Sequence, residues 1–184
     1  MMAESDAELI VAVRAGSVDA VATLIRRHWG RCHRLAYLIV GDVAAAEDVT
    51  QEAILSAIHA LDGFEEGRPV EPWLHRIVVN EARDWLRRQA RAPGLVADPD
   101  GFRSLEAEPE LPDALGGDLL DGIRRLRPEY RVAIVLRYVL DYTPAEIGQE
   151  LDVPAATVRT RLRRALSELR HAIEREVDSN AVAP

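Results

Sequence analysis

The sequence predicts an all-α protein made of two small helical domains that are joined by a flexible acidic linker. Apolar residues recur every three or four positions in both halves, and no segment shows the alternation and flanking turns of a strand. The middle segment, residues 92–117, has four prolines and four glycines, and its six acids and one arginine give it a charge of −5. The expected domains are therefore residues 1–91 and 118–177, with a short tail at 178–184.

The composition limits the classes of protein that fit. The formal net charge is −8, and all 23 basic residues are arginine. The single cysteine, Cys32, excludes an internal disulfide framework and suits a reducing compartment. No apolar run approaches the roughly 20 residues of a membrane span, and the N-terminus carries acids where a signal peptide needs positive charge. We therefore expect a cytoplasmic protein that does not insert into a membrane.

Four helices are expected in the N-terminal half. The first starts from a capping box formed by Ser5 and Glu8 and ends at Gly16. Amphipathic patterns predict the next three at about residues 18–40, 43–61 and 70–91.

The third of these helices has an acidic-polar face. Asp48, Gln51, Glu52 and His59 cluster on it around an apolar residue, Leu55, while the opposite face is apolar. An isolated exposed leucine on a solvated helix means little. An acidic face with an apolar centre is nevertheless suited to docking a basic partner helix. The pattern alone leaves both interpretations open.

The fourth helix carries a polar stripe along one side. Its members recur at spacings of three or four residues: Arg76, Asn80, Arg83, Arg87 and Arg91. Such a stripe can follow phosphates, and asparagine can recognise adenine or a splayed base; a solubilising face is the alternative. Glu81 falls inside the apolar arc of the same helix, where an arginine such as Arg88 would have to pair with it.

Residues 143–170 have the pattern of a helix-turn-helix. Thr143 is a suitable N-cap, Pro144 fits the first helical position, and Glu146 completes a capping box. Residues 152–154, Asp-Val-Pro, break this helix, and a second helix follows.

This second helix separates an apolar face from a basic one. The apolar face comprises Val158, Leu162, Ala165, Leu166, Leu169 and Ile173. The opposite face carries Thr160, Arg163 and Arg164, with Arg159 at its border. Residues 155–170 hold five arginines and one acid. A basic helix after a tight helical turn is the arrangement whose second helix enters the DNA major groove, although many such helices are only solvated.

Three segments, taken together, match one family in order and separation. They are AAAEDVTQEAILSAIHALDGF, EPWLHRIVVNEARDWLRRQAR and LRPEYRVAIVLRYVLDYTPAEIGQELDVPAATVRTRLRRAL. They look like the core-polymerase-binding helix, the −10 promoter segment and the −35 promoter domain of the bacterial RNA polymerase sigma factors. The chain resembles the small extracytoplasmic-function (ECF) group of the sigma-70 family over nearly its whole length.

The resemblance implies a role for each set of residues. The surface that grips a coiled coil of the largest polymerase subunit would be Asp48, Gln51, Glu52 and Leu55. The −10 element would lie on the helix carrying Arg76, Asn80, Arg83 and Arg87. A flipped single-stranded base would enter the loop at 62–72, where Phe64 and Trp73 shape the pocket. The −35 element would be recognised by Arg159, Thr160, Arg163 and Arg164.

The resemblance also implies a function. It is that of an alternative sigma factor of the bacterial cytoplasm, which recruits core RNA polymerase to promoter DNA, catalyses no reaction and needs no cofactor. An anti-sigma factor is a further partner that the sequence leaves open. The chain departs from the usual family pattern at Ala156, where glycine is usual, at Gly148, where alanine is usual, and at residues 140–142, which replace a glycine-bearing turn.

Two other classes are weighed against this one. A stand-alone helix-turn-helix regulator would need a sensor or receiver domain, and the N-terminal half offers no alternating strands for one. An enzyme or metal site could be sought at His28, Cys32 and His33. His33 points away from the other two, and no further ligand is nearby, so no metal site is predicted.

Overall fold

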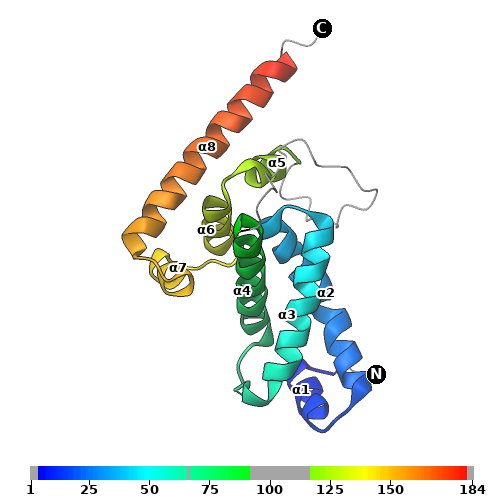
Figure 1. The fold of residues 1–184 in the computed structure, drawn as a ribbon. Helices are drawn as coiled ribbons and strands as arrows, with labels where there is room; N and C mark the ends of the chain where they lie inside the picture. The colour runs from blue at the N-terminus through cyan, green and yellow to red at the C-terminus, as the bar shows by residue number, and fades with distance from the viewer. Residues whose placement is uncertain (1–3, 66, 92–116, 182–184) are drawn as a thin grey trace. The chain divides into compact units, whose positions relative to one another are not determined.

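The computed structural model describes residues 4–65, 67–91 and 117–181, with side chains described as far as residue 172. These residues form two compact units, and each is helical (Figure 1). The helices are α1 (Asp6–Arg14), α2 (Val18–Val40), α3 (Val43–Ala60), α4 (Val70–Arg91), α5 (Gly117–Arg125), α6 (Pro128–Tyr138), α7 (Pro144–Leu151) and α8 (Ala155–Ala181), with a 3₁₀ turn, η1, at Leu61–Gly63.

The all-α prediction is confirmed, since no strand occurs in the described residues. The acidic linker expected at 92–117 lies outside them, apart from Gly117, which begins α5. The tail expected at 178–184 is helical as far as Ala181, and its last three residues are outside the described part.

In the first unit, α2, α3 and α4 pack on one another and α1 packs on α2. Side-chain caps fix the helix starts, because Ser5, Ser17 and Asp42 each accept a hydrogen bond from a backbone N–H of the first turn. The capping box predicted at Ser5 and Glu8 is confirmed. The most deeply buried core side chains are Leu9, Cys32, Ala36, Ile39, Ala46, Val49, Ala53, Val78, Val79 and Ala82.

Glu81 is paired differently from the sequence-based suggestion. The hydroxyl of Ser56 on α3 donates to Oε1 of Glu81 on α4 at 2.8 Å. The carboxylate therefore has a hydrogen-bond donor from the neighbouring helix, which lowers the cost of placing it in an otherwise apolar arc. Arg88 lies near Glu81, since both line one hollow between α3 and α4, but the two side chains form no hydrogen bond or ion pair.

Polar contacts join α1 to α2. One of them involves His28, a residue of the metal site weighed as an alternative above. Asp6 lies 3.0 Å from Nε2 of buried His28 and 2.5 Å from Nη1 of Arg27. Burial acts to raise the pKa of Asp6, but hydrogen bonds from Arg27 and His28 outweigh it and the pKa is lowered. Cys32 is buried, and burial raises the pKa of its thiol to about 11. Its surroundings are those of an inert interior thiol.

In the second unit, α5, α6 and α7 all contact α8. The capping box predicted at Thr143 and Glu146 is confirmed. Arg131 is buried, and its Nη2 donates to the carbonyls of Arg124 at 2.7 Å and Leu126 at 3.0 Å, which closes the end of α5. Burial lowers the pKa of Arg131 to about 10.

One residue of the predicted apolar face of α8 lies elsewhere. Val158, Leu162, Ala165 and Leu169 are buried as expected, but Leu166 is 42% exposed. The helix thus buries a narrower stripe than the sequence indicated, because only residues that face α5, α6 or α7 are covered.

Aspartates in the left-handed region close the two turns that flank α7. Asp141 has φ of 57° in the turn that lacks the family's usual glycine, and Asp152 has φ of 53° between α7 and α8. Aspartate tolerates this region better than most residues. The second turn comes so close to α7 that a Cβ on Gly148 would lie 2.7 Å from the carbonyl oxygen of Val153. Glycine is therefore required at 148 by the tight approach of the turn.

We expect Gly148→Ala to destabilise the second unit by about 1–3 kcal/mol, because the new Cβ overlaps backbone that must move. In a helix without such a close contact, replacing glycine by alanine stabilises by about 1 kcal/mol. We expect this gain for Gly30→Ala, because a Cβ at residue 30 meets nothing within 4 Å. All three tryptophans, Trp29, Trp73 and Trp85, lie in the first unit.

Urea unfolding followed by two probes separates these effects. Tryptophan fluorescence reports on the first unit, whereas far-ultraviolet circular dichroism reports on both. Gly148→Ala should move the part of the dichroism change that comes from the second unit to lower urea and leave the fluorescence transition in place. A stabilised second unit in this variant would show that the turn does not need glycine.

Candidate nucleic-acid and partner-binding surfaces

The N-terminal part of α8 presents the residues predicted to recognise the −35 element. Arg159, Thr160, Arg163 and Arg164 are all exposed, while Val158 and Leu162 anchor the helix in the core. The Thr160 hydroxyl donates to the carbonyl of Ala156 at 3.0 Å, which holds it against the helix. The arrangement matches a recognition helix whose apolar side packs on the domain and whose basic side remains available.

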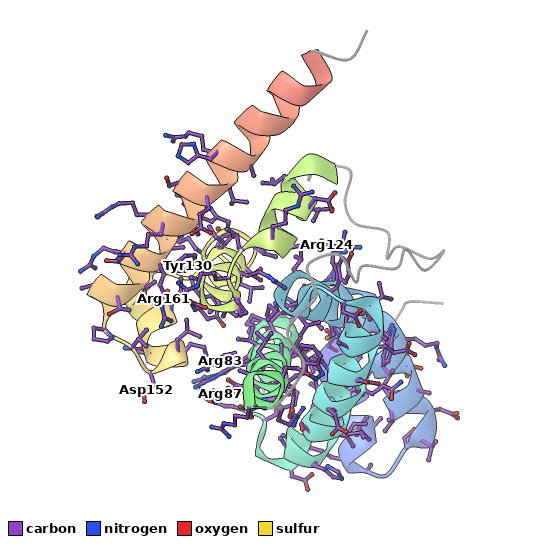
Figure 2. All side chains as sticks on the ribbon, turned by 45° about the horizontal axis from the view of Figure 1, so that its top comes forward. Arg83, Arg87, Arg124, Tyr130, Asp152 and Arg161 are labelled. Carbon is purple, nitrogen blue, oxygen red and sulfur yellow. The ribbon has the colours of Figure 1, made fainter. Side chains whose placement is uncertain are left out.

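Tyr130 on α6 is a neighbour of this surface that the sequence did not indicate (Figure 2). Nη1 of Arg164 lies 3.4 Å from its hydroxyl oxygen, at the long end of hydrogen-bond distances. This hydrogen bond is the main reason that the pKa of Arg164 is raised. The contact limits where the Arg164 guanidinium can reach, whereas Arg159 and Arg163 have no recorded partner among the described residues.

The polar stripe of α4 lies largely at the surface. Arg76, Asn80, Arg87 and Arg91 are exposed and Arg83 is half-buried. Arg83 and Arg87 project from α4 in Figure 2. Nη1 of Arg83 lies 3.4 Å from the amide oxygen of Asn80, and Nη1 of Arg87 lies 2.9 Å from Oδ1 of Asp84. Asp84 is thus a carboxylate beside the stripe, so phosphates would compete with it for Arg87.

The aromatic pair predicted to shape a base pocket is in contact. The ring centroids of Phe64 and Trp73 are 4.9 Å apart, and the planes are tilted by 54°. Phe64 is only 7% exposed, whereas Trp73 is half-buried. Phe64 therefore packs against the ring of Trp73, and Trp73 offers the more accessible aromatic surface of the two.

The acidic surface of α3 is exposed as expected, and it continues onto α4. Asp48, Gln51, Glu52 and Leu55 are all exposed, with Leu55 at 51%. The first three line a hollow of about 260 Å³ whose other wall is made by α4 residues: Glu81, Trp85 and Arg88. The sequence pattern predicts none of these α4 residues on the surface, because helix periodicity does not show which neighbouring helix faces which.

The described fold and surfaces define the class of protein. It is an all-helical protein of two units, one with an acidic hollow and a basic helix, the other with a basic helix-turn-helix. Among the described residues, no helix is long and apolar enough to cross a bilayer. The same residues contain no group of three or more His, Cys, Asp or Glu side chains that could hold a metal ion.

Comparison with known families identifies the chain within this class. The model of sigma-70 region 2 matches residues 24–92, and that of sigma-70 region 4 matches residues 117–169. The chain is 34% identical over 164 residues to the ECF RNA polymerase sigma factor SigE of Mycolicibacterium smegmatis, covering 86% of this chain and 63% of that longer protein. It is 31% identical over 170 residues to the ECF sigma factor SigW of Bacillus subtilis, covering 86% and 91% respectively.

A solved structure agrees on the fold. The sigma factor RpoE of Bartonella quintana, crystallised with the anti-sigma factor NepR, superposes with a TM-score of 0.59 at 19% identity, covering 85% of this chain and 98% of that one. The chain belongs to the ECF group of the sigma-70 family. It is an alternative sigma factor, which binds core RNA polymerase and directs initiation at specific promoters; the comparisons do not favour a stand-alone regulator.

Proposed function

We propose that the work of this sigma factor is divided between its two units. Residues 1–91 hold core RNA polymerase and the −10 element, and residues 118–177 recognise the −35 element. The linker at 92–117 and the tail at 178–184 complete the chain. The observation that carries this proposal is that α3, α4 and α8 each expose a charged face while an apolar face of the same helix is buried. The buried face of each helix holds it in its unit, and the exposed charged face is available to bind a partner.

The polymerase contact is the acidic surface of α3. Asp48, Gln51 and Glu52 supply charge and hydrogen-bonding groups, and Leu55 supplies an exposed apolar centre. A basic helix of a coiled coil in the largest polymerase subunit would complement these features. The hollow shared with α4 adds Trp85, an aromatic side chain of the kind that carries binding energy at interfaces.

Promoter contact is shared by α4 and α8. Arg76, Asn80, Arg83 and Arg87 follow the −10 strand, and the segment containing Phe64 together with Trp73 receives an unstacked base. In the second unit the −35 element is recognised by Arg159, Thr160, Arg163 and Arg164. Because one chain holds two DNA elements and the polymerase, weak individual contacts add up through their high effective concentration.

The function requires binding and no catalysis by the chain itself. Sigma factors are transcription initiation factors that carry out no reaction, and we propose the same for this chain. We also place it in the bacterial cytoplasm, where core polymerase acts. An anti-sigma factor is proposed as a further partner, because the Bartonella quintana sigma factor was solved bound to one.

In-vitro transcription with sigma-free core polymerase on a promoter library tests the proposed function. The purified chain should elute together with core polymerase in size-exclusion chromatography and should confer initiation at a defined set of −35 and −10 words. A chain that elutes apart from core polymerase and binds DNA on its own would instead be a stand-alone regulator.

Asn80→Ala should slow promoter opening by about 10-fold and leave polymerase binding unchanged, since Asn80 is exposed on α4 where an unpaired base would pass. Opening is followed by permanganate reactivity of unpaired thymines, and polymerase binding by fluorescence anisotropy. A template mismatched across the −10 element should restore most of the lost activity. Equal impairment of opening and of polymerase binding would count against this role for Asn80.

A further inference from the structure

One arginine of α1 is hydrogen bonded to the 3₁₀ turn η1, which follows α3, and to Phe64 directly after it. Within this turn the carbonyl of Leu61 accepts a hydrogen bond from the backbone N–H of Phe64 at 3.1 Å. Arg14 donates to the carbonyl of Leu61 from Nε at 3.2 Å and from Nη2 at 2.9 Å. The same Nη2 donates to the carbonyl of Phe64 and lies 3.5 Å from that of Asp62. A single guanidinium therefore joins the end of α1 to a segment 47 to 50 residues further along the chain.

This segment is where the proposed base-capture loop begins. Phe64 has an extended backbone, with φ of −70° and ψ of 128°, and its ring packs on Trp73 in the first turn of α4. The described residues that follow, Glu65 and those from Gly67 to Pro69, are exposed. Arg14 thus binds the backbone at Leu61 and at Phe64, immediately before the exposed loop, and the ring of Phe64 packs on Trp73.

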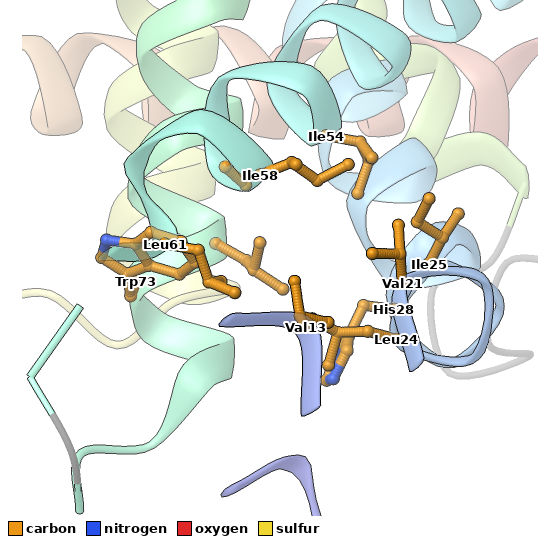
Figure 3. A pocket seen from close by; sticks show the side chains of 11 residues that line it. Val13, Val21, Leu24, Ile25, His28, Ile54, Ile58, Leu61 and Trp73 are labelled. Carbon is orange, nitrogen blue, oxygen red and sulfur yellow. The ribbon is translucent and has the colours of Figure 1, made fainter. Parts of the chain in front are cut away.

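A small apolar pocket lies next to the segment that Arg14 holds. Leu61 and Trp73 line an apolar pocket (Figure 3). Val13, the neighbour of Arg14, and Ile58 line it too, and both are only half-buried. Leu61 and Phe64 are buried, and the Arg14 fork binds the carbonyl of each.

The chemistry of arginine suits this task. Its planar guanidinium presents several donors in a fixed geometry, which lets one side chain serve several carbonyls at once. A positive charge is also favourable beside the C-terminus of a helix, where the partial charge is negative.

We infer that Arg14 is a positioning residue for base capture at the −10 element: it holds residues 61–64 so that Phe64 and Trp73 form a surface on which an unstacked promoter base can bind. The inference rests on the proposed function of this loop. Arg14 acts through the backbone of its neighbours and itself touches no DNA.

The test uses a single-stranded −10 oligonucleotide from a promoter selected by the holoenzyme. An abasic site replaces each position in turn, and within each protein variant the affinity for every abasic strand is compared with the affinity for the intact strand. Wild-type holoenzyme should lose about 10-fold in affinity when the captured base is removed. Arg14→Ala holoenzyme should bind the intact strand and this abasic strand equally. A ratio measured within one variant is unaffected by a partly unfolded population.

Arg26→Ala is the matched control, because Arg26 is an exposed arginine of the same unit whose Nη2 donates to Thr23 Oγ1 in its own helix at 3.0 Å. It should keep the full 10-fold preference. An Arg14→Ala protein that also keeps the preference, or that binds both strands more weakly by one factor, overturns the inference. A wild-type holoenzyme for which no position matters overturns the base-capture function itself, and the inference with it.

Discussion

Replacing Asp48 and Glu52 together by arginine should lower the affinity for core RNA polymerase by at least ~100-fold, because like charges would then face a basic partner across the interface. Both residues are exposed on α3 beside the hollow that α3 shares with α4. Neither takes part in a recorded hydrogen bond or ion pair within the described residues, so their replacement removes nothing that holds the unit together. Anisotropy of labelled sigma factor titrated with core polymerase measures the effect.

The control reverses two other exposed carboxylates of the first unit, Glu4 and Asp19, which lie outside α3. It changes the net charge of the chain by the same amount, so it separates a local contact from long-range attraction. The control should keep affinity within about 3-fold at physiological salt, where exposed charges are screened beyond roughly 8 Å. Normal polymerase affinity in the Asp48 and Glu52 variant, with its tryptophan fluorescence intact, would remove this surface from the interface.

The helices could be predicted from the sequence because residues close to each helix end determine where the helix begins and stops. Ser5 with Glu8 and Thr143 with Glu146 are capping boxes separated by three residues, and each forms as predicted. The bounds expected for the second and fourth helices, 18–40 and 70–91, agree with α2 and α4. The outward placement of the α3 and α8 charges followed from the same periodicity, since a charged side chain is costly to bury.

Contacts between distant segments could not be predicted in this way. The Ser56–Glu81 hydrogen bond and the Arg14 fork join residues 25 and 47 to 50 positions apart, and periodicity gives no information on such pairs. Leu166 was misplaced because an apolar residue on a helix is covered only where another helix lies over it. The need for Gly148 became visible only when the turn at Val153 was seen to approach it.

Among the four residues proposed for the −35 element, we expect Arg163 to be the base-specific one, because it lies on the basic face of α8 whereas Arg159 lies at the border of that face. Arg163 is exposed and has no recorded partner among the described residues, whereas the Thr160 hydroxyl is bound to its own helix and Arg164 contacts Tyr130. A guanidinium free of internal bonds can turn both of its outer nitrogens toward the edge of a guanine. Arg159 has the same freedom one turn earlier, at the border of the basic face.

Arg163→Ala should therefore reduce discrimination between the preferred −35 word and its single-base variants by about 1–3 kcal/mol at one position. Arg170→Ala is the comparison, since Arg170 is also exposed on α8 but lies two turns beyond Arg163. Any loss of initiation in this variant should be equal for all −35 sequences and should shrink as salt is added. Initiation by holoenzyme on a library of −35 variants gives both quantities in one experiment. A uniform loss across the library for Arg163→Ala would make that residue a phosphate contact, and base recognition on α8 would then have to come from Arg159 or from Arg164 released from Tyr130.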